Sequence, residues 1–189
     1  MSLKDEREMK LLYGFSDAEV QKRIEKSMRE RGYELETVCV CGKSNILSYL
    51  EQHPEIETCI FTEVMQDGSS FNSMDLTQIT DERDINIIIV LDIERKGSEF
   101  VRQLYAGGIL NGLFVNSSIK NSGVSVPDIV DLIMEPRNRK VAKIYYGIAN
   151  EAIEDINKLS RDKIQEYIRF LSNEGDYSDI GEWKYWKQQ

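Results

Sequence analysis

The fold of this chain is decided by the stretch Thr58-Cys59-Ile60-Phe61-Thr62-Glu63, a short apolar run that ends in a carboxylate. The run breaks off at Gln66-Asp67-Gly68-Ser69-Ser70, which is rich in turn-forming residues. A short apolar run bounded by turn residues is typical of a strand buried on both faces. Ligands of open α/β sheets bind just past the carboxyl ends of the strands, so Glu63 is the first candidate functional residue.

Strands and helices alternate on both sides of this stretch. The apolar runs predict five strands, at residues 10–15, 33–41, 58–63, 85–91 and 112–116. Helical spacing, caps and stops predict helices between residues 16 and 32 and between 42 and 53, and at 74–79, 99–105 and 126–134. A capping box of Ser16 and Glu19 is expected to start the first helix. Strands that alternate with helices predict a parallel sheet with helices on both faces.

The pattern changes after Pro136, where only helices are predicted. Residues 1–136 contain 14 Lys/Arg and 24 Asp/Glu, a balance of −10, whereas residues 137–189 contain 10 and 9, a balance of +1. We therefore predict an α/β domain over residues 9–136 and an all-helical C-terminal extension over residues 137–189.

The net charge of −9 counts against a general nucleic-acid-binding protein, which shows a basic footprint. The basic cluster Arg137-Asn138-Arg139-Lys140 is interpreted as a solvated helix start, with nucleic acid or an acidic partner as the alternative. No run of about 18 apolar residues occurs, so no membrane span is predicted. The charged residues 4–8 do not form the apolar segment of a signal peptide, which predicts a cytoplasmic location.

Cysteine and histidine usage offers no predicted catalytic or metal centre. Cys39, Cys41 and Cys59 lie in predicted strands and are interpreted as reduced, buried thiols. A Cys-x-Cys metal site would need a second pair of ligands, and the only histidine, His53, lies in a loop before Pro54. A lone histidine also counts against a His-based nucleophilic triad. No cofactor and no metal are predicted.

The C-terminal extension is rich in aromatic residues at helical spacing. Tyr167 lies in one amphipathic segment, and Trp183 and Trp186 lie in the last one. Large apolar side chains in so short a segment need a surface to bury against. We expect them to pack on the α/β domain or to form an interface with a protein partner or with a second copy of the chain.

The predicted α/β domain resembles the receiver domain of bacterial response regulators, over roughly residues 9–134. Five strand–helix units carry the resemblance, and Tyr105-Ala106-Gly107-Gly108 looks like the Ala-Gly-Ala phrase that ends the fourth helix of receivers. The resemblance implies a flavodoxin-like (CheY-like) fold with strand order 2-1-3-4-5 and a role in signal transduction.

The resemblance also shows where this chain departs from a working receiver. Receivers that take a phosphoryl group hold Mg²⁺ with an acidic pair after the first strand and carry an aspartate after the third. They place a Ser or Thr after the fourth strand and a Lys after the fifth. A hard cation needs oxygen ligands, and a lysine neutralises the added charge. The matching positions here are Gly14-Phe15, Glu63, Leu91 or Asp92, and Asn116.

These replacements imply a degenerate receiver, a non-catalytic regulatory or protein-interaction module that lacks the phosphorylation machinery. Without a metal site and a lysine, Glu63 has no group to stabilise a phosphoryl-transfer transition state. The chain is similar in this respect to the N-terminal pseudo-receivers of TadZ/CpaE-type pilus-assembly proteins, although the P-loop ATPase domain of those proteins does not follow here.

Two alternatives remain open at the level of sequence. Glu63 and Asp92 are a candidate carboxylate pair for metal binding or acid–base catalysis, which would make the chain an unusual phosphoacceptor or a metal-dependent enzyme. The simpler interpretation is that they are two solvated acids at the ends of strands. Gly42-Lys43-Ser44 lies between a strand and a helix, as a P-loop does, but Thr37 stands where that motif needs its first glycine. A small-molecule or nucleotide sensor that uses the strand-end crevice is the other alternative.

Overall fold

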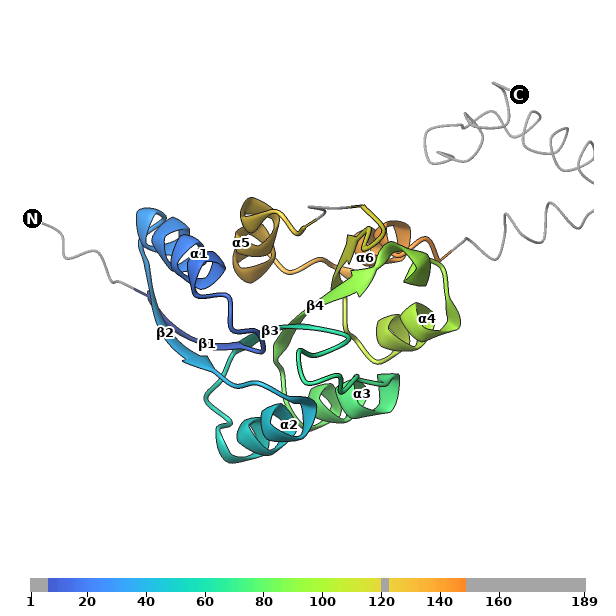
Figure 1. Ribbon diagram of the computed structural model, residues 1–189, viewed down its shortest axis with the longest axis horizontal. Coiled ribbons are helices and arrows are strands. Elements are labelled where there is room, and N and C mark those ends of the chain that lie inside the picture. Colours follow the sequence, from blue (N-terminus) through green and yellow to red (C-terminus); the bar gives the residue numbers. More distant parts are fainter. Residues whose placement is uncertain (1–6, 120–122, 149–189) are drawn as a thin grey trace, which may run out of the picture. The chain divides into compact units, whose positions relative to one another are not determined.

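The chain divides into two compact units, Met1–Ile148 and Ala149–Gln189. The structure is a computed structural model, and it describes residues 7–119 and 123–148 (Figure 1). The expectations for Tyr167, Trp183 and Trp186 therefore concern residues outside the described part of the chain. Within the described ranges, every helix is too short or too polar to span a bilayer.

The described unit is built on a five-stranded parallel sheet with the order β2-β1-β3-β4-β5, which confirms the predicted flavodoxin-like, receiver-like fold. Ile60 pairs with Ile88 at the centre of the sheet, and Val90 pairs with Leu113 next to one edge. β3 lies in the middle, as expected for a strand that is apolar on both faces. The strands are β1 (Arg7–Tyr13), β2 (Tyr33–Cys39), β3 (Thr58–Thr62), β4 (Asn86–Asp92) and β5 (Asn111–Val115).

Helices cover both faces of the sheet (Figure 1). α1 and α5 lie over one face, and α2, α3 and α4 lie over the other. The helices are α1 (Ala18–Glu30), α2 (Lys43–Gln52), α3 (Ser73–Glu82), the 3₁₀ turn η1 (Ile93–Arg95), α4 (Glu99–Ala106), α5 (Val126–Met134) and α6 (Arg139–Tyr145).

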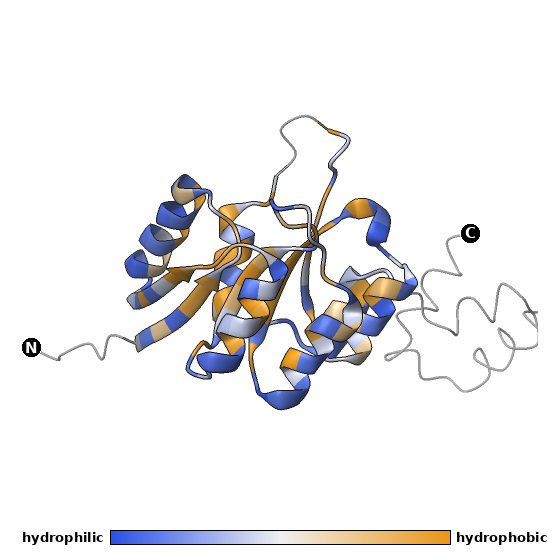
Figure 2. Ribbon diagram, turned by 60° about the horizontal axis from the view of Figure 1, so that its bottom comes forward, coloured by the Kyte–Doolittle hydropathy of each residue, from blue (hydrophilic) through white to orange (hydrophobic). Residues whose placement is uncertain are grey.

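Alternation along the central strands divides the core into two layers. Ile60 and Ile88 belong to the apolar cluster beneath α1 and α5, whereas Phe61 and Ile89 belong to the one beneath α2, α3 and α4. Successive strand residues point to opposite faces, so each strand supplies both layers. Figure 2 shows hydrophobic residues concentrated on the strands and hydrophilic residues on the outer sides of the helices.

The start of α1 differs from the prediction. The cap is Asp17, whose Oδ1 accepts the amides of Glu19 and Val20, each at 3.1 Å. The Ser16 hydroxyl instead donates to Oε1 of Gln66 at 2.8 Å, in the loop after β3. The prediction of a Ser16 cap was wrong because a carboxylate one residue later is an equally good cap and fits the chain geometry.

α6 covers the open edge of β5. The Tyr146 hydroxyl accepts the Gly112 amide and donates to the Ile109 carbonyl, both at 2.8 Å. Nη1 of Arg137 donates to the Gly112 carbonyl at 2.7 Å. These side chains bond the outward backbone groups that an edge strand otherwise leaves free. α6, which the sequence analysis assigned to the extension, therefore packs with the sheet, and the boundary at residues 136 and 137 stays a prediction.

Candidate functional site

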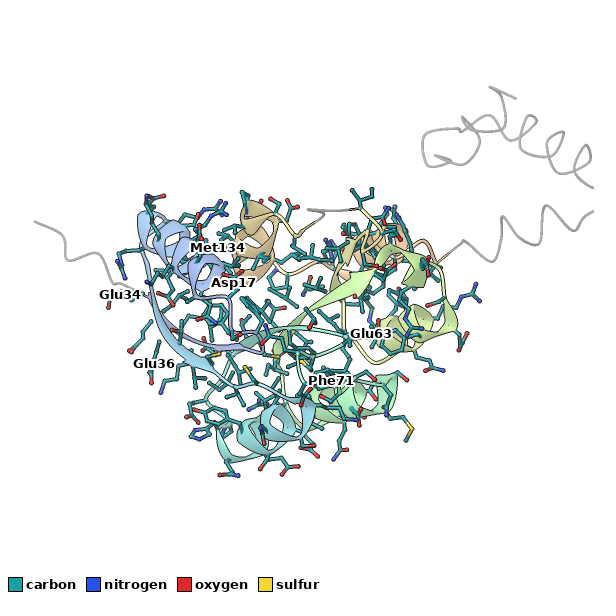
Figure 3. All side chains as sticks on the ribbon, viewed as in Figure 1. Asp17, Glu34, Glu36, Glu63, Phe71 and Met134 are labelled. Atoms are coloured by element: carbon teal, nitrogen blue, oxygen red, sulfur yellow. The ribbon has the colours of Figure 1, made fainter. Side chains whose placement is uncertain are left out.

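The candidate positions lie where the loops leave the carboxyl ends of β1, β3, β4 and β5. Figure 3 shows Glu63 at the end of β3, with Phe71 nearby at the approach to α3. Phe71 stacks on Phe61 with ring centres 4.5 Å apart. The Glu63 amide donates to the Val90 carbonyl at 3.0 Å, and the Glu63 carbonyl accepts the Phe71 amide at 2.9 Å. The backbone of Glu63 is thus held on both sides.

The Glu63 carboxylate forms a two-point ion pair with Arg95. Nη2 of Arg95 donates to Oε1 at 2.5 Å, and Nε donates to Oε2 at 3.1 Å. The side chain of Glu63 is only 8% exposed, whereas that of Arg95 is 47% exposed. The guanidinium also lies 5.1 Å from the ring centre of Phe100 in α4. A planar guanidinium matches a carboxylate at two points, so the pair ties the end of β3 to η1.

Glu63 is therefore not the solvated strand-end acid of the simpler interpretation. That interpretation was wrong because Arg95, 32 residues later in the chain, folds over the carboxylate. The position of Arg95 in the sequence could have identified it as a partner of Glu63. It lies three residues after Asp92, and β4 ends at the same edge of the sheet as β3.

Asp92 has different partners from Glu63. Its Oδ1 accepts the Glu94 amide at 2.9 Å, which caps η1, and its Oδ2 accepts the Ser117 hydroxyl and, at 3.3 Å, the Ser117 amide. The hydrogen bond from the Glu94 amide, followed by that from the Ser117 hydroxyl, holds the pKa of Asp92 below its ordinary value. Asp92 joins the loops after β4 and β5. Among the described residues, no three His, Cys, Asp or Glu side chains gather in a way that could hold a metal ion.

Gly14 and Phe15 directly follow β1, where the resemblance predicts the metal-binding acids of a working receiver. A Cβ on Gly14 would lie 2.5 Å from the Cβ of Phe61 and 2.9 Å from Cδ1 of Ile46. The Phe15 ring packs edge-on against Tyr13, with ring centres 5.3 Å apart, in the layer beneath α1 and α5. The position is closed by packing, since no side chain of any kind fits at Gly14 without a shift of β3.

Asn116 organises the loop after β5. Its Oδ1 accepts the Ser118 amide at 3.1 Å, and its carbonyl accepts the Ile119 amide at 3.0 Å. An amide side chain that bonds the backbone two residues on forms a local turn. Asn116 therefore has a structural role here and carries no charge with which to balance a phosphoryl group.

A short hairpin after β3 packs against the start of α2. Val64 and Ser70 form an antiparallel bridge, and Oδ1 of Asp67 accepts both the amide and the hydroxyl of Ser69. The Ser69 hydroxyl in turn accepts the Lys43 amide at 3.2 Å. The side-chain hydrogen bond from Ser69 is the main cause that holds the pKa of Asp67 below its ordinary value. The hairpin thus fills the space in front of the Gly42-Lys43-Ser44 turn.

The Gly42-Lys43-Ser44 turn is engaged by the protein itself. Gly42 has a φ of 88°, and a Cβ there would lie 2.7 Å from Oδ2 of Asp67. Nζ of Lys43 pairs with Asp75 at 3.0 Å. These contacts give the glycine and the lysine structural explanations that require no phosphate.

The cysteines differ from one another in exposure. Cys59 is buried in the core, as expected, but Cys39 and Cys41 are exposed. The prediction of three buried thiols was wrong for these two because β2 is an edge strand that ends at Cys39, and Cys41 lies two residues beyond that end, outside the strand that was predicted to include it. In the described part of the chain, no group of three or more His, Cys, Asp or Glu side chains that could hold a metal ion forms around them.

No protein-family model matches the chain, and no curated protein matches it. Solved structures of similar fold include a signal receiver domain from Vibrio parahaemolyticus, at 12% identity and a TM-score of 0.47, which covers 76% of this chain and 98% of that one. A response regulator receiver protein from Pseudomonas putida has 16% identity and a TM-score of 0.43 and covers 70% of this chain and 98% of that one.

A third similar structure is an orphan response regulator of H. pylori, at 12% identity and a TM-score of 0.45, with 67% of this chain and 93% of that chain covered. Two of these three structures are named as receivers, and the third is named as a response regulator. At such low identity and TM-scores, the strand order established above remains the basis for the fold, and the site must be interpreted from its own residues.

Proposed function

We propose that this chain is a receiver-like regulatory module that acts through protein–protein contacts and takes no phosphoryl group by the usual receiver chemistry. The observation that carries the proposal is the ion pair of Glu63 with Arg95. A carboxylate whose two oxygens are both bound to a guanidinium, with its side chain 8% exposed, is a poor nucleophile because attack would require the pair to break.

Two neighbouring features support the same proposal. The tight contact of Gly14 with Phe61 leaves no room for a metal-binding acid at the end of β1. At the end of β5, Asn116 supplies no positive charge. Phosphoryl transfer depends on cations placed where negative charge develops, so a site without them offers little rate enhancement.

The ion pair also explains how such a module works without modification. Phosphorylation adds charge that creates new hydrogen bonds and fixes a nearby loop. Here, Arg95 already fixes the segment after β4 to the end of β3. We propose that the pair holds one permanent conformation of this edge, so that regulation comes from which partner is present.

The proposed module comprises the receiver-like domain of residues 9–136 and the extension of residues 137–189, and it resembles the pseudo-receivers of TadZ/CpaE-type proteins in purpose. Its partner is another protein or a second copy of the chain. The free thiols of Cys39, Cys41 and Cys59 fit the reducing environment of the cytoplasm.

Phosphoryl acceptance can be measured directly. The full chain is incubated with Mg²⁺ and acetyl phosphate, or with beryllofluoride, and examined by intact-mass spectrometry and thermal unfolding. We expect no phosphoryl adduct and no shift in Tm. A stoichiometric adduct that disappears in Glu63→Ala, while the matched Glu57→Ala variant still forms it, would contradict the proposal.

A further inference from the structure

The two edges of the sheet are treated differently by the rest of the described unit. At one edge α6 covers β5, and the side chains of Tyr146 and Arg137 bond the outward backbone groups of that strand. The other edge is β2, at the outer end of the sheet (Figure 1). Its pairing with β1 is continuous over seven residues, without a bulge or a proline. An edge strand of this kind is a template on which another strand can pair.

The outward backbone groups of β2 can be assigned from one hydrogen bond. The Val40 amide donates to the Tyr13 carbonyl at 2.9 Å, so the backbone of Val40 faces β1. The backbone groups of successive residues in a strand point to opposite sides, so those of Leu35 and Thr37 face away from β1. Within the residues that the structure describes, no other group bonds them. The edge of β2 therefore offers a row of free donors and acceptors.

The side of β2 that faces the α2 layer carries an excess of negative charge. Glu34 and Glu36 project on the same side as Val38, which packs in that layer, and Figure 3 shows both glutamates at the outer margin of the sheet. Glu8 of β1 lies opposite Glu34, and Lys10 lies opposite Glu36. Like charges on neighbouring strands are destabilising. Three carboxylates on this side thus face one ammonium group.

Lys10 does not neutralise this surface. Its Nζ pairs with Glu36 at 3.1 Å. The hydrogen bond and the charge of Glu36 raise the pKa of Lys10, and the charges of Glu55 and Glu8 add to the effect. Among the described side chains, Glu8 and Glu34 have no ion-pair partner. The α2 side of the edge is therefore open to further cations.

The other side of β2 has no such excess of charge. Tyr33 and Leu35 are half-buried against the layer beneath α1 and α5. Glu25 and Arg29 of α1 lie beside them, one acid and one base. The Thr37 hydroxyl donates to Glu25 at 3.2 Å. An uncharged side chain of a neighbouring strand fits this side best.

We infer that the β2 edge binds an extended segment of another protein, which adds a sixth strand to the sheet and places basic side chains against Glu34 and Glu36. The inference rests on the proposed function, since it names the class of partner that the module binds. Residues opposite Glu34 and Glu36 are two apart in the added strand, so its pattern is basic, uncharged, basic. Main-chain hydrogen bonds supply the affinity, and the alternate side chains supply the specificity.

A second copy of the chain is a poorer partner for this edge. Its own β2 would bring the same two carboxylates, Glu34 and Glu36, to the contact, and like charges across a strand pair are destabilising. Charged side chains on an edge strand are a usual protection against self-association. The same acids that repel another copy attract a basic strand.

The test adds a fluorescently labelled seven-residue peptide, in which lysine alternates with valine, to the full chain. We expect a rise in fluorescence anisotropy that diminishes at high salt. In amide hydrogen exchange followed by NMR, the peptide should slow the exchange of the Leu35 and Thr37 amides, whereas the Glu36 amide, which faces β1, should change little. A glutamate–valine peptide and a peptide with its lysines grouped at one end are the controls, and both should bind more weakly.

Variants of the chain separate the backbone from the charge. Thr37→Pro removes one outward N–H at a place where an edge strand tolerates proline, and it should raise the Kd of the lysine–valine peptide about tenfold or more. Thr37→Ala keeps that N–H, so its Kd should match that of the unmodified chain. Glu34→Lys should weaken the lysine–valine peptide and favour the glutamate–valine peptide. Glu99→Lys, at an exposed position in α4, should change neither, and circular dichroism would verify that each variant folds.

Three outcomes would overturn the inference. The lysine–valine peptide fails to bind, which would leave the acids as a protection of the edge alone. The peptide binds but leaves the Leu35 and Thr37 amides exchanging as before, which would place the contact elsewhere. Exchange of these amides slows with protein concentration in the absence of peptide, which would make a second copy the partner. The acetyl phosphate experiment is independent of all three, so failure of this inference and failure of the proposed function can be told apart.

Discussion

The hydroxyl of Tyr146 and the amide of Gly112 are hydrogen-bonded at 2.8 Å, and through this contact α6 completes the edge of the sheet. The ring lies so close that a Cβ on Gly112 would be 2.7 Å from Cε1 of Tyr146. Desolvation of the buried hydroxyl is the main cause that raises the pKa of Tyr146, which keeps the group protonated and able to donate to Ile109. Two backbone groups of the edge therefore depend on one side chain.

Replacement of Tyr146 by Phe should destabilise the protein. The variant keeps the ring but leaves the Gly112 amide and the Ile109 carbonyl without their partner in a buried place. We expect the free energy of unfolding in urea to fall by about 1–3 kcal/mol, the usual cost of a buried polar group left without a hydrogen bond. Tyr145→Phe is the matched control, because its longer bond to Phe114, at 3.4 Å, should cost less. Equal losses of stability in the two variants would show that the Tyr146 hydrogen bonds stabilise the protein no more than the longer Tyr145 bond does.

The Glu63–Arg95 pair should respond unequally to the loss of its two members. Arg95→Gln leaves a buried carboxylate without a cation, whereas Glu63→Gln leaves a half-exposed guanidinium that water can solvate. We expect a loss of about 2–3 kcal/mol for Arg95→Gln and about 1 kcal/mol for Glu63→Gln in urea unfolding. The double variant should resemble Glu63→Gln. A larger loss for Glu63→Gln than for Arg95→Gln would mean that the carboxylate is not confined as the structure shows it.

These two contacts mark what sequence patterns could and could not predict. The strands followed from apolar runs such as 85–91, because burial on both faces leaves a local signature, whereas their order was implied only by the resemblance to receiver domains. The partners of Glu63 and Gly112 leave none, since Arg95 and Tyr146 lie 32 and 34 residues away and approach only through the fold. The edge position of β2 has the same origin: cysteine is usually a buried residue, yet Cys39, at the end of this edge strand, and Cys41, just beyond it, are exposed.

Asp92 provides a prediction on pH. Its pKa is lowered in the folded state, so the stabilisation is present above the pKa of the unfolded chain and is lost as the pH falls through the folded value. Ser117→Ala removes one of the donors, so the Asp92 pKa should rise toward its ordinary value in a carboxyl NMR titration. The stability difference between the two proteins should be full at neutral pH and should vanish in acid.

Ser118→Ala is the control for that titration. The contact of Ser118 with the Asn116 side chain uses its backbone amide, which the substitution keeps. The Asp92 titration should therefore be the same as in the unmodified chain. An Asp92 pKa that is the same in Ser117→Ala would contradict the assignment of the hydroxyl as a donor.

The thiols should separate into two classes of reactivity. Burial raises the pKa of Cys59 to about 12, and desolvation also raises the pKa of Cys41, but Cys39 and Cys41 are exposed to a reagent and Cys59 is not. Because the thiolate is the reactive form, a disulfide reagent such as DTNB should label Cys39 and Cys41 in the native chain and Cys59 only after unfolding. Labelled peptides identified by mass spectrometry would check this. Rapid native labelling of Cys59 would mean that β3 opens far more easily than a central strand should.

The closed position at Gly14 leads to the last prediction, which concerns the site itself. If the chain lacked only a carboxylate there, Gly14→Asp would restore part of a metal site. The structure predicts a different result, because any Cβ at this position would lie 2.5 Å from that of Phe61 in the central strand. Such overpacking in a core costs about 1–3 kcal/mol or more. Gly14→Ala and Gly14→Asp should therefore both lower the urea midpoint, and Gly14→Asp should show no increase in Tm with added Mg²⁺.

A second substitution decides whether Phe61 causes the loss. Phe61 and Gly14 touch through the Phe61 Cβ, so the smaller side chain of Phe61→Ala still meets an added methyl group at Gly14. Phe61→Gly removes the contact, at the cost of a cavity in the core. In a double-mutant cycle, Gly14→Ala should therefore cost less beside Phe61→Gly than beside Phe61→Ala. Equal costs in both backgrounds would place the obstacle elsewhere, with Ile46 as the remaining neighbour, 2.9 Å from the added Cβ.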